Sequence, residues 1–216
     1  MADSPASLGL CLWNVTIKLE STALISLNDT IEPGEVLTVM GPSGSGKSTL
    51  LAAITGTLAR EFTMYGRVLL GGRDVTDLPT EARHVGILFQ DEHLFPHMSV
   101  GGNLAFGLKP SIKGRAARQK HVEDALTEVG LDGFADRDPA TLSGGQRARV
   151  ALQRTLMSEP RALLLDEAFS KLDTDLRQQT RELVFQKARA RSLPVLQVTH
   201  DHSDAEAAEG RVHLIA

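Results

Sequence analysis

Short apolar runs alternate with amphipathic segments along most of this chain. The apolar runs predict buried β-strands, and apolar positions that recur every three or four residues predict helices. Strands are expected at residues 8–19, 23–31, 35–40, 66–73, 85–89, 161–166, 194–199 and 211–215. Helices are expected at residues 48–54, 79–82, 100–108, 115–129, 143–157, 175–190 and 201–208. This alternation predicts an α/β fold, with a mainly parallel sheet and helices on both of its faces.

The first expected strand contains a run of alternating side chains. Strict alternation would place Cys11, Trp13, Val15 and Ile17 on one face and Leu10, Leu12, Asn14 and Thr16 on the other. We therefore expect Cys11 to be a small core residue and Trp13 to lie in the core.

The middle of the chain has a different character. From about residue 91 to residue 140, strand-like runs disappear and helical patterns take over. We interpret the chain as a single domain, residues 1–216, with a helical subdomain at about residues 91–140 inserted in the α/β core. The basic side chains of this region include Lys109, Lys113, Arg115, Arg118 and Lys120. Because no aromatic residues interleave with them, we interpret them as solvated surface and expect no nucleic-acid partner.

Composition narrows the cellular context. The chain has 216 residues and a net charge of −4, so no global field favours DNA or anionic lipid. A single cysteine excludes an internal disulfide and fits a reducing cytoplasm. The polar N-terminus lacks the features of a secretory signal, and no apolar run is long enough to cross a bilayer. A role at a membrane would therefore need a partner.

The strongest chemical signal is a glycine-rich loop after the expected strand at residues 35–40. The loop consists of Gly41, Pro42, Ser43, Gly44, Ser45, Gly46, Lys47, Ser48 and Thr49. It has the phosphate-loop pattern of a glycine, four residues and then Gly-Lys-Ser, placed between a strand and a helix. A glycine-rich turn with a stray lysine is the structural alternative, which this context disfavours.

Each part of the loop has a chemical purpose. Gly41, Gly44 and Gly46 permit backbone angles closed to other residues and let the main chain approach a ligand. Backbone N–H groups and the helix N-terminus then favour an anion. Lys47 brings a positive charge to the outer phosphates, and the Ser48 hydroxyl can ligate Mg²⁺. The loop predicts binding of a nucleoside triphosphate.

Two carboxylates follow the apolar strand at residues 161–166. Ligands bind at the carboxyl ends of the strands in open α/β sheets, which is where Asp166 and Glu167 lie. Asp166 is placed to hold the Mg²⁺ that bridges the outer phosphates, and Glu167 to orient or polarise the attacking water. The alternative is a strand that ends in two solvated acids. Combined with the phosphate loop, the pair indicates a hydrolase.

A second helix start suited to anions begins near Ser143. Ser143 resembles an N-cap, and Gly144 and Gly145 leave backbone N–H groups near the positive end of the helix, before Gln146. A capped helix after a glycine-rich turn is the structural alternative. A simple phosphate-loop kinase, transferring phosphate to a metabolite, has no use for this second start.

Six motifs in this order resemble the ATP-binding subunit of an ABC transporter over nearly the whole chain. The phosphate loop matches the Walker A motif, residues 163–167 the Walker B strand with its catalytic glutamate, and residues 142–146 the family signature. Gln90 matches the Q-loop glutamine, residues 170–173 the D-loop and His200 the switch histidine. The stretch at residues 90–100 is similar to bacterial importer subunits, in particular the small YnjD-type group.

The resemblance implies a fold, an activity and a location. The fold would be a P-loop NTPase core with an antiparallel β subdomain and an inserted helical subdomain. The activity would be hydrolysis of ATP with Mg²⁺, coupled to transport across a membrane. The protein would be cytoplasmic and peripheral on the inner face of the bacterial plasma membrane. Its partners would be transmembrane permease subunits and, indirectly, a periplasmic binding protein.

Residue roles also follow from the resemblance. The implied catalytic residues are Glu167, His200, Gln90 and Lys47. The implied ligands of Mg²⁺ are Ser48, Gln90 and Asp166. His200 would hydrogen-bond the γ-phosphate, and Gln90 would contact Mg²⁺ or the attacking water and pass the nucleotide state to the helical subdomain.

In this family two copies pair head-to-tail around ATP. The residues that would reach ATP on the second copy are Ser143, Gly144, Gly145 and Gln146. Asp173 would lie at the interface, and ATP held by Lys47 of the other copy would close the dimer until hydrolysis released it. A short permease helix is expected to dock between Gln90 and Val100. A single copy should bind ATP but hydrolyse it poorly.

Three departures from the family pattern have consequences. Residues 14–35 contain no aromatic to stack on adenine, and Leu19 or a neighbour offers only apolar contact, so we expect GTP to compete unusually well. Ala168 stands where proline is common, which should loosen the turn after Glu167. The chain stops at Ala216, so we expect no C-terminal regulatory domain of the maltose-importer type.

Other functions remain as alternatives at this point. The main one is a soluble ABC-type ATPase acting on DNA or ribosomes. Its DNA-repair members insert long coiled coils between the glutamine and the signature, and its translation members carry two domains, neither of which fits here. An exporter subunit is an alternative within the family. In such a transporter, specificity for the substrate would lie in the membrane and binding subunits.

Overall fold

The computed structural model describes residues 8–215. The chain forms two compact units, each with its own apolar core. Among the described residues, the first unit contains residues 8–87, 161–167 and 185–215. The second contains Leu88–Pro160 and Ala168–Val184.

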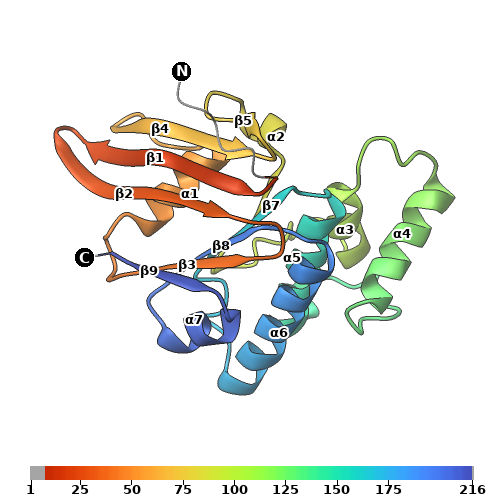
Figure 1. Cartoon of the computed structure of the whole chain (residues 1–216). Helices are drawn as coiled ribbons and strands as arrows, with labels where there is room; N and C mark the ends of the chain where they lie inside the picture. Colours follow the sequence, from red (N-terminus) through yellow and green to blue (C-terminus); the bar gives the residue numbers. More distant parts are fainter. Residues whose placement is uncertain (1–7, 216) are drawn as a thin grey trace. The chain divides into compact units, whose positions relative to one another are not determined.

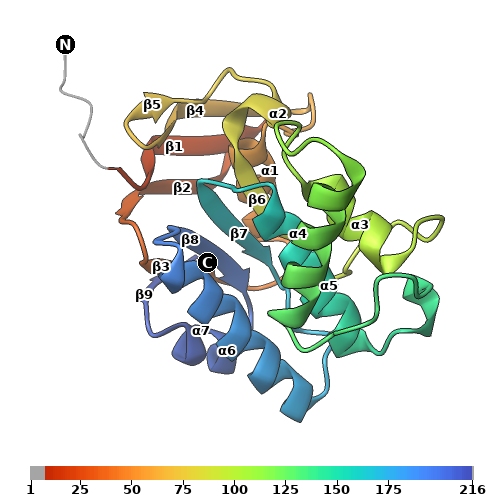
Figure 2. The same cartoon turned by 90° about the vertical axis from the view of Figure 1, so that its right-hand side faces the viewer.

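A five-stranded parallel sheet, in the order β6-β7-β8-β3-β9, is the centre of the first unit (Figures 1 and 2). Its strands are β3 (Val36–Met40), β6 (Val85–Leu88), β7 (Ala162–Asp166), β8 (Val195–Thr199) and β9 (Arg211–Leu214). Helices α1 (Lys47–Thr55) and α7 (His202–Ala208) cover opposite sides of this sheet (Figures 1 and 2). Because β3, β7 and β8 run in parallel, their carboxyl ends meet at one edge.

A four-stranded antiparallel sheet completes the first unit. Its order is β2-β1-β4-β5, with β1 at Leu10–Leu19, β2 at Thr22–Ile31, β4 at Phe62–Leu70 and β5 at Arg73–Asp74. One apolar core joins side chains of this sheet to α1 and to the parallel sheet. The α/β fold with its antiparallel part, predicted from the sequence, is therefore confirmed.

The predicted alternation along β1 is wrong, because the strand contains a bulge at Asn14. Asn14 has a φ of 49°, and the register of β1 against β2 shifts between Leu12 and Val15. An extra residue returns the following side chains to the earlier face. Leu12 and Val15 therefore enter the same core, together with Leu10 and Ile17.

The expected core position of Trp13 is also wrong. The indole is half-buried, and the guanidinium carbon of Arg67 lies 5.3 Å from its ring centroid, a cation–π arrangement. Cys11, by contrast, is buried as predicted.

Arg83 anchors the far end of α1. It belongs to α2 (Thr80–Arg83) and is 6% exposed. Its Nη1 donates to the carbonyl oxygens of Ala53 at 2.8 Å and Ile54 at 3.0 Å, and its Nε donates to that of Leu78 at 2.7 Å. The last carbonyls of a helix lack partners within the helix, so this arginine satisfies them. It fixes the helix that begins at the phosphate loop.

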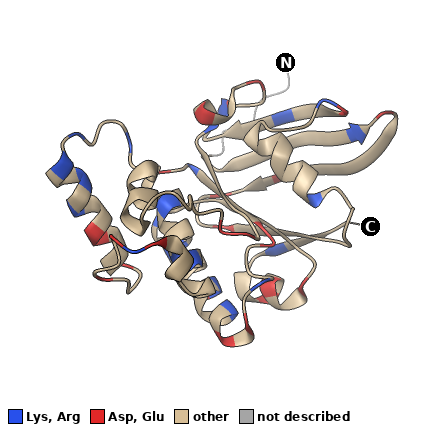
Figure 3. Ribbon diagram, turned by 180° about the vertical axis from the view of Figure 1, so that it is seen from behind, with Lys and Arg blue, Asp and Glu red and all other residues tan. Residues whose placement is uncertain are grey.

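The second unit is mainly helical. Its helices are α3 (Val100–Gly107), α4 (Arg115–Thr127), α5 (Gly144–Met157) and the first part of α6 (Thr174–Ala190). A short 3₁₀ helix, Pro139–Thr141, precedes α5. Helix α3 packs on both α4 and α5 around an apolar core that includes Leu104, Leu126 and Val150. Basic and acidic residues are interspersed on α4 (Figure 3), where Lys120 pairs with Asp124 at 2.8 Å.

Candidate active site

The phosphate loop connects the buried strand β3 to the first turn of α1. Gly44 and Gly46 have φ values of 84° and 88°, in the left-handed region that glycine adopts most easily. Gly41 is needed for a different reason. A Cβ on Gly41 would lie 2.6 Å from Cγ1 of Ile215 and 2.9 Å from Oγ of Ser45, so only glycine fits between them.

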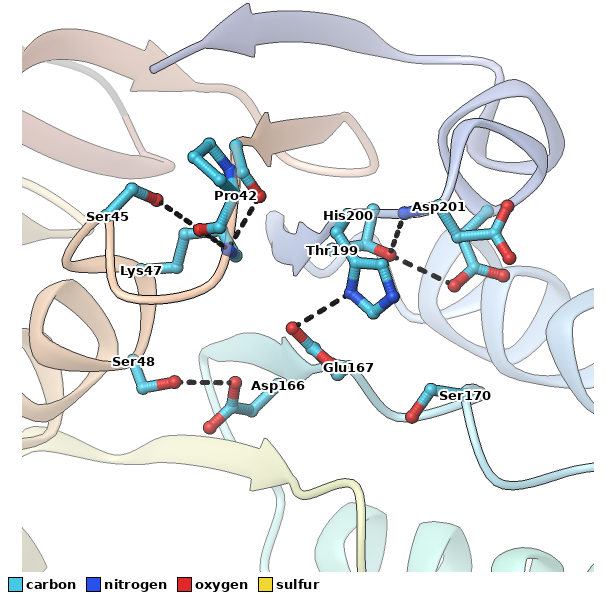
Figure 4. Close-up of polar contacts among 12 residues, drawn as sticks. Pro42, Ser45, Lys47, Ser48, Asp166, Glu167, Ser170, Thr199, His200 and Asp201 are labelled. Carbon is cyan, nitrogen blue, oxygen red and sulfur yellow. Dashed lines mark hydrogen bonds and ion pairs between the residues drawn. The ribbon is translucent and has the colours of Figure 1, made fainter. Parts of the chain in front are cut away.

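Lys47 is turned back onto the loop that precedes it. The side chain is only 5% exposed, and Nζ donates to the carbonyl oxygens of Gly41 and Pro42, each at 2.7 Å. The hydroxyl of Ser45 also donates to Pro42 O, at 2.8 Å (Figure 4). The ammonium group is therefore held inside the curve of the loop by backbone oxygen atoms.

Ser48 and Asp166 bring a hydroxyl and a carboxylate together. The Ser48 hydroxyl donates to Oδ1 of Asp166 at 3.1 Å (Figure 4). Burial raises the pKa of Asp166, with a contribution from the neighbouring charge of Glu167, although the Ser48 hydrogen bond and Lys47 act in the opposite direction. The raised pKa means that this environment disfavours the ionised carboxylate. A bound cation would offset that cost, because it favours the ionised form.

The donor atoms at this position suit Mg²⁺. Mg²⁺ prefers oxygen ligands and commonly binds through one or two protein groups, with phosphates and waters completing the shell. The Ser48 hydroxyl and the Asp166 carboxylate supply two such oxygen atoms. Within residues 8–215, no group of three or more His, Cys, Asp and Glu side chains forms a metal site by itself.

Glu167 faces His200 across the ends of β7 and β8. Oε1 of Glu167 lies 3.2 Å from Nδ1 of His200 (Figure 4). Glu167 has a φ of 47°, unusual for a residue with a side chain, and its N–H donates to Val198 O at 3.1 Å. Strained backbone of this kind is common at functional sites, where it aims a side chain.

A network that the sequence analysis missed holds the loop of His200. The buried Thr199 hydroxyl donates to Oδ2 of Asp204 at 3.2 Å and accepts from the N–H of Asp201 at 3.0 Å. Asp201 is in turn the N-cap of α7 and accepts from the N–H of Ser203 at 2.8 Å. The order Asp-His-Ser before a helical segment is a capping signal, so the N-cap could have been found from sequence.

The first unit thus brings five predicted residues together. The residues are Lys47 and Ser48 from the start of α1, Asp166 and Glu167 at the end of β7, and His200 after β8 (Figure 4). Gln90 and Ser143 to Gln146 belong to the second unit. Gln90 follows β6 and is exposed.

Helix α5 begins with the predicted N-cap. Oγ of Ser143 accepts from the N–H of Gln146 at 3.3 Å, and Oε1 of Gln146 accepts from the N–H of Ser143 at 3.0 Å, which is a capping box. A Cβ on Gly145 would lie 2.1 Å from Cδ1 of Leu176, whereas one on Gly144 would be 3.8 Å from the nearest atom. Gly145 therefore lets α5 approach α6 closely.

The D-loop residue Asp173 has a local structural contact. Its Oδ1 accepts from the N–H of Leu176 at 3.0 Å, at the start of α6. Arg177 donates from Nε to Phe169 O and from Nη2 to Ser170 O, each at 3.0 Å, and so fixes the loop before Asp173.

A protein-family model described as "ABC transporter" matches residues 24–170. The chain belongs to the ABC transporter family. It is 51% identical over 199 residues, 92% of this chain and 91% of the relative, to a protein of Escherichia coli K12 named "Uncharacterized ABC transporter ATP-binding protein YnjD". The predicted resemblance is therefore confirmed.

Two further relatives carry the names of substrates. "Fe(3+) ions import ATP-binding protein FbpC 1" of Rhizobium meliloti is 44% identical over 191 residues, 88% of this chain but only 53% of the relative. "Thiamine import ATP-binding protein ThiQ" of Jannaschia sp. is 42% identical over 206 residues, 95% of this chain and 88% of the relative. The chain spans about half the length of the iron-import relative.

This ABC protein is the ATP-binding, ATP-hydrolysing type of subunit, whose hydrolysis is coupled to transport. That result supports the transporter interpretation over a kinase or a soluble ATPase that acts on DNA or ribosomes. Among the helices within residues 8–215, none is both long and apolar enough to span a membrane.

Aliphatic side chains of β2 line one side of the phosphate loop, the side that faces the antiparallel sheet. A Cβ on Gly46 would lie 3.5 Å from Cβ of Leu24 and 3.6 Å from that of Ile25. Leu19, at the end of β1, is 39% exposed and pairs in register with Phe62 of β4. Phe62 is thus an aromatic cross-strand neighbour of Leu19. The sequence did not predict this pairing, because the corresponding strand was expected to begin only at Gly66.

Proposed function

We propose that this chain is the ATPase subunit of a bacterial importer. The five residues Lys47, Ser48, Asp166, Glu167 and His200 would form one half of an ATP-hydrolysing site, and a second copy of the chain would supply the other half. The observation that carries the proposal is the presence of two pairs, Ser48 with Asp166 and Glu167 with His200, at one edge of the parallel sheet. One pair offers oxygen ligands for a cation, and the other offers a carboxylate and an imidazole for the reacting phosphate and water. Importer function is proposed because the iron and thiamine relatives are named as import subunits.

The phosphate loop would bind the triphosphate of ATP. Backbone N–H groups of residues 41–49 and the N-terminus of α1 supply donors for the phosphate oxygen atoms. Lys47 would exchange its bonds to the carbonyl oxygens of Gly41 and Pro42 for bonds to the outer phosphates. A charged acceptor forms the stronger hydrogen bond, which favours that exchange.

Mg²⁺ would be held by Ser48 and Asp166, with Gln90 as the further candidate. When bound, the ion would neutralise charge on the outer phosphates. Asp166 is suited to this role because its half-buried carboxylate already accepts from Ser48 and would gain a compensating positive charge.

Glu167 would position the water that attacks the γ-phosphorus. Its carboxylate, just after β7, would accept a hydrogen bond from that water. His200 would hydrogen-bond an oxygen of the γ-phosphate, for which its imidazole would leave Glu167. A bond would form between the water oxygen and the γ-phosphorus, and the bond from that phosphorus to the β–γ bridging oxygen would break. Glu167 would accept the proton that the water loses, and ADP and phosphate would be the products.

The rest of the site would come from a second copy of the chain, paired head-to-tail. Ser143, Gly144, Gly145 and Gln146 at the start of α5 would contact the phosphates bound by the partner copy, and Asp173 would lie between the copies. The capped helix start supports this role, because its N-terminus favours an anion. ATP would join the two copies, and hydrolysis would release them.

The same proposal places the chain at a membrane. Permease subunits would dock a short helix near residues 90–100, and Gln90 would report the nucleotide state to that surface. The chain would then be cytoplasmic and peripheral on the inner face of the plasma membrane, and a periplasmic binding protein would act indirectly through the permease.

Reconstitution tests this function. The chain would be co-expressed with the permease genes beside its own and purified through a tag on the permease. We expect co-purification and ATP hydrolysis that depends on Mg²⁺ and is lost in Glu167→Gln. Hydrolysis stimulated by DNA or ribosomes, with no association with the permease, would contradict the proposal.

A further inference from the structure

Two arginines of α5 contact the segment that follows Gln90. Arg154 donates from Nη1 to His93 O at 2.9 Å and from Nη2 to Glu92 O at 3.3 Å. Its guanidinium carbon also lies 4.9 Å from the ring centroid of Phe95. One side chain therefore contacts three of the four residues 92–95, two through backbone oxygen atoms and one through an aromatic ring.

Arg147 makes the second connection, near the signature. Its Nη1 donates to Leu142 O at 2.8 Å, and its Nε lies 3.5 Å from Oε2 of Glu92. Arg147 and Arg154 are seven residues apart, about two turns of helix, so they lie on the same face of α5. Arg147 therefore joins the turn just before the signature helix to the same segment.

Asn103 supports the next part of the segment from α3. It is fully buried, its Oδ1 accepts from the N–H of Phe95 at 2.8 Å, and its Nδ2 donates to Phe95 O and Ser99 O, each at 3.1 Å. Nη1 of Arg154 lies 3.3 Å from the same Oδ1. Residues 92–99 are thus fixed to α3 and α5 by a set of mostly half-buried polar contacts within the second unit.

We infer that Arg154, assisted by Arg147, is a positioning residue that makes residues 92–95 a rigid extension of the signature helix. A displacement of the start of α5 then moves this segment directly, in addition to any effect that passes through Gln90. The meaning of that movement for transport rests on the proposed function, because residues 90–100 are the proposed docking surface of the permease. The mechanical connection itself does not depend on a permease.

Hydrogen exchange of the purified chain tests the connection without a membrane partner. In a Glu167→Gln background, exchange at the amides of residues 92–98 is measured with and without ATP and Mg²⁺. We expect ATP to change exchange there, and Arg154→Met to accelerate exchange about tenfold without nucleotide, because two charge-assisted bonds are lost. We also expect Arg154→Met to remove the ATP-dependent change at residues 92–98 while residues 143–150 still respond.

Arg149 provides the matched control. It lies on the same helix and also donates to a backbone oxygen, from Nη1 to Val129 O at 3.1 Å, away from residues 92–95. Arg149→Met should leave exchange at residues 92–98 and its response to ATP unchanged. The inference is overturned if Arg154→Met behaves like Arg149→Met, or if ATP produces no change at residues 92–98 in the Glu167→Gln background.

Arg154→Lys is a second test variant, which keeps the inference testable if Arg154→Met does not fold. Lysine keeps the charge and the apolar stem but cannot reach both carbonyl oxygens at once. We expect it to unfold at nearly the parent temperature and to accelerate exchange at residues 92–98 about threefold, since one of two bonds is kept. Parent-like exchange in a folded Arg154→Lys protein would contradict the inference.

The reconstituted transporter separates this inference from the proposed function. With permease present, Arg154→Lys should retain the basal hydrolysis of the isolated chain and lose most of the stimulation by the permease. If the parent chain does not bind the permease, the proposed function fails while the exchange result still stands. If the parent is stimulated and Arg154→Lys is stimulated equally, the inference fails alone.

Discussion

His200 and Glu167 lie within hydrogen-bonding distance, with Nδ1 of the imidazole 3.2 Å from Oε1 of the carboxylate. They come from the ends of different strands, β8 and β7, which pair in parallel. The carboxylate that is proposed to orient water is therefore already held by the group proposed to contact the γ-phosphate. Arrival of the phosphate would draw His200 away and free Glu167 for the water.

Glu167→Gln is expected to keep ATP binding and to lower the rate of hydrolysis by about 10²- to 10⁴-fold, because an amide is a weaker acceptor for the proton of the attacking water. Binding would be followed with a fluorescent ATP analogue, and hydrolysis by phosphate release. The variant should also accumulate as a dimer of two 23.3 kDa chains in ATP, measured by light scattering.

Glu209→Gln is the control for this change. Glu209 also has a left-handed φ, of 51°, but lies at the end of α7, where it pairs with Arg189 at 3.2 Å. Its substitution should leave hydrolysis unchanged. Hydrolysis at the parent rate in Glu167→Gln would show that the water-positioning role belongs to another residue.

Lys47→Ala is expected to weaken nucleotide binding itself, by about tenfold or more, because a buried charge-assisted contact to phosphate is lost. Titration with the same fluorescent nucleotide measures this effect. Lys120→Ala serves as the comparison, since Lys120 is exposed and pairs with Asp124 in a surface salt bridge. Equal affinity of the two variants would contradict the assignment of Lys47.

Asp166→Asn is expected to stabilise the protein without nucleotide or Mg²⁺ while impairing hydrolysis. Burial raises the pKa of Asp166 above its ordinary value near 3.8, so the folded state resists ionisation of this group. The parent chain therefore loses stability as the pH rises through the interval above 3.8, and the asparagine variant does not. At pH 7, we expect the variant to melt on the order of 2 °C higher, with the difference vanishing below pH 3.8.

Asp74→Asn should show the opposite sign. Burial alone would raise the pKa of Asp74, but hydrogen bonds from Thr76 outweigh it and the net pKa is lowered. This carboxylate therefore stabilises the fold when ionised, and that contribution is present above the ordinary value and lost as the pH falls through the folded pKa. Thermal melts of both variants in a chelator, from pH 3 to pH 8, would reveal the two opposite trends; parallel curves would contradict both assignments.

Gly145→Ala and Gly144→Ala are expected to differ in stability although they are neighbours. The new Cβ at position 145 would lie 2.1 Å from Leu176, so α5 and α6 or the leucine must shift, at a cost of about 1–3 kcal/mol. At position 144 the nearest atom would be 3.8 Å away, and unfolding should be almost unaffected. Denaturant unfolding of the two variants measures the difference, and Leu176→Ala should restore part of the loss in Gly145→Ala.

GTP is expected to compete unusually well with ATP. The residues beside the phosphate loop on this side, Leu24 and Ile25, are aliphatic, as is Leu19, so no stacking on an aromatic ring from residues 14–35 favours adenine. Inhibition of ATP hydrolysis by increasing GTP measures the preference. Leu19→Tyr should increase the preference for ATP, and a large preference in the parent chain would count against this prediction.

Local motifs allowed much of the protein to be predicted. The phosphate loop and the capping box of Ser143 and Gln146 are complete within a few residues. In the capping box, each hydrogen bond joins a backbone N–H to a side-chain oxygen three residues away. The strand that ends at Asp166 was also predicted from local sequence, because a short and wholly apolar run indicates a buried strand. The sequence thus placed Asp166 at the end of a strand and Ser48 at the start of a helix, as the structure has them, although it expected the helix to begin one residue later than Lys47.

The tertiary structure decided the features that depend on distant segments. The bulge at Asn14 changed which side chains of β1 enter the core, and no local signal marked it. The bonds from Arg154 to the carbonyl oxygens of Glu92 and His93 could not be deduced, because backbone acceptors carry no sequence signature.

The sequence by itself determined the chemical groups of this ATPase, since the spacing of glycines, lysine and carboxylates is a local property of the chain. The tertiary structure alone decided which groups face one another. Ser48 meets Asp166, and Glu167 meets His200, because parallel pairing brings the ends of β3, β7 and β8 to one edge. Strand order and register depend on how the whole core packs, and packing is a property of all segments together.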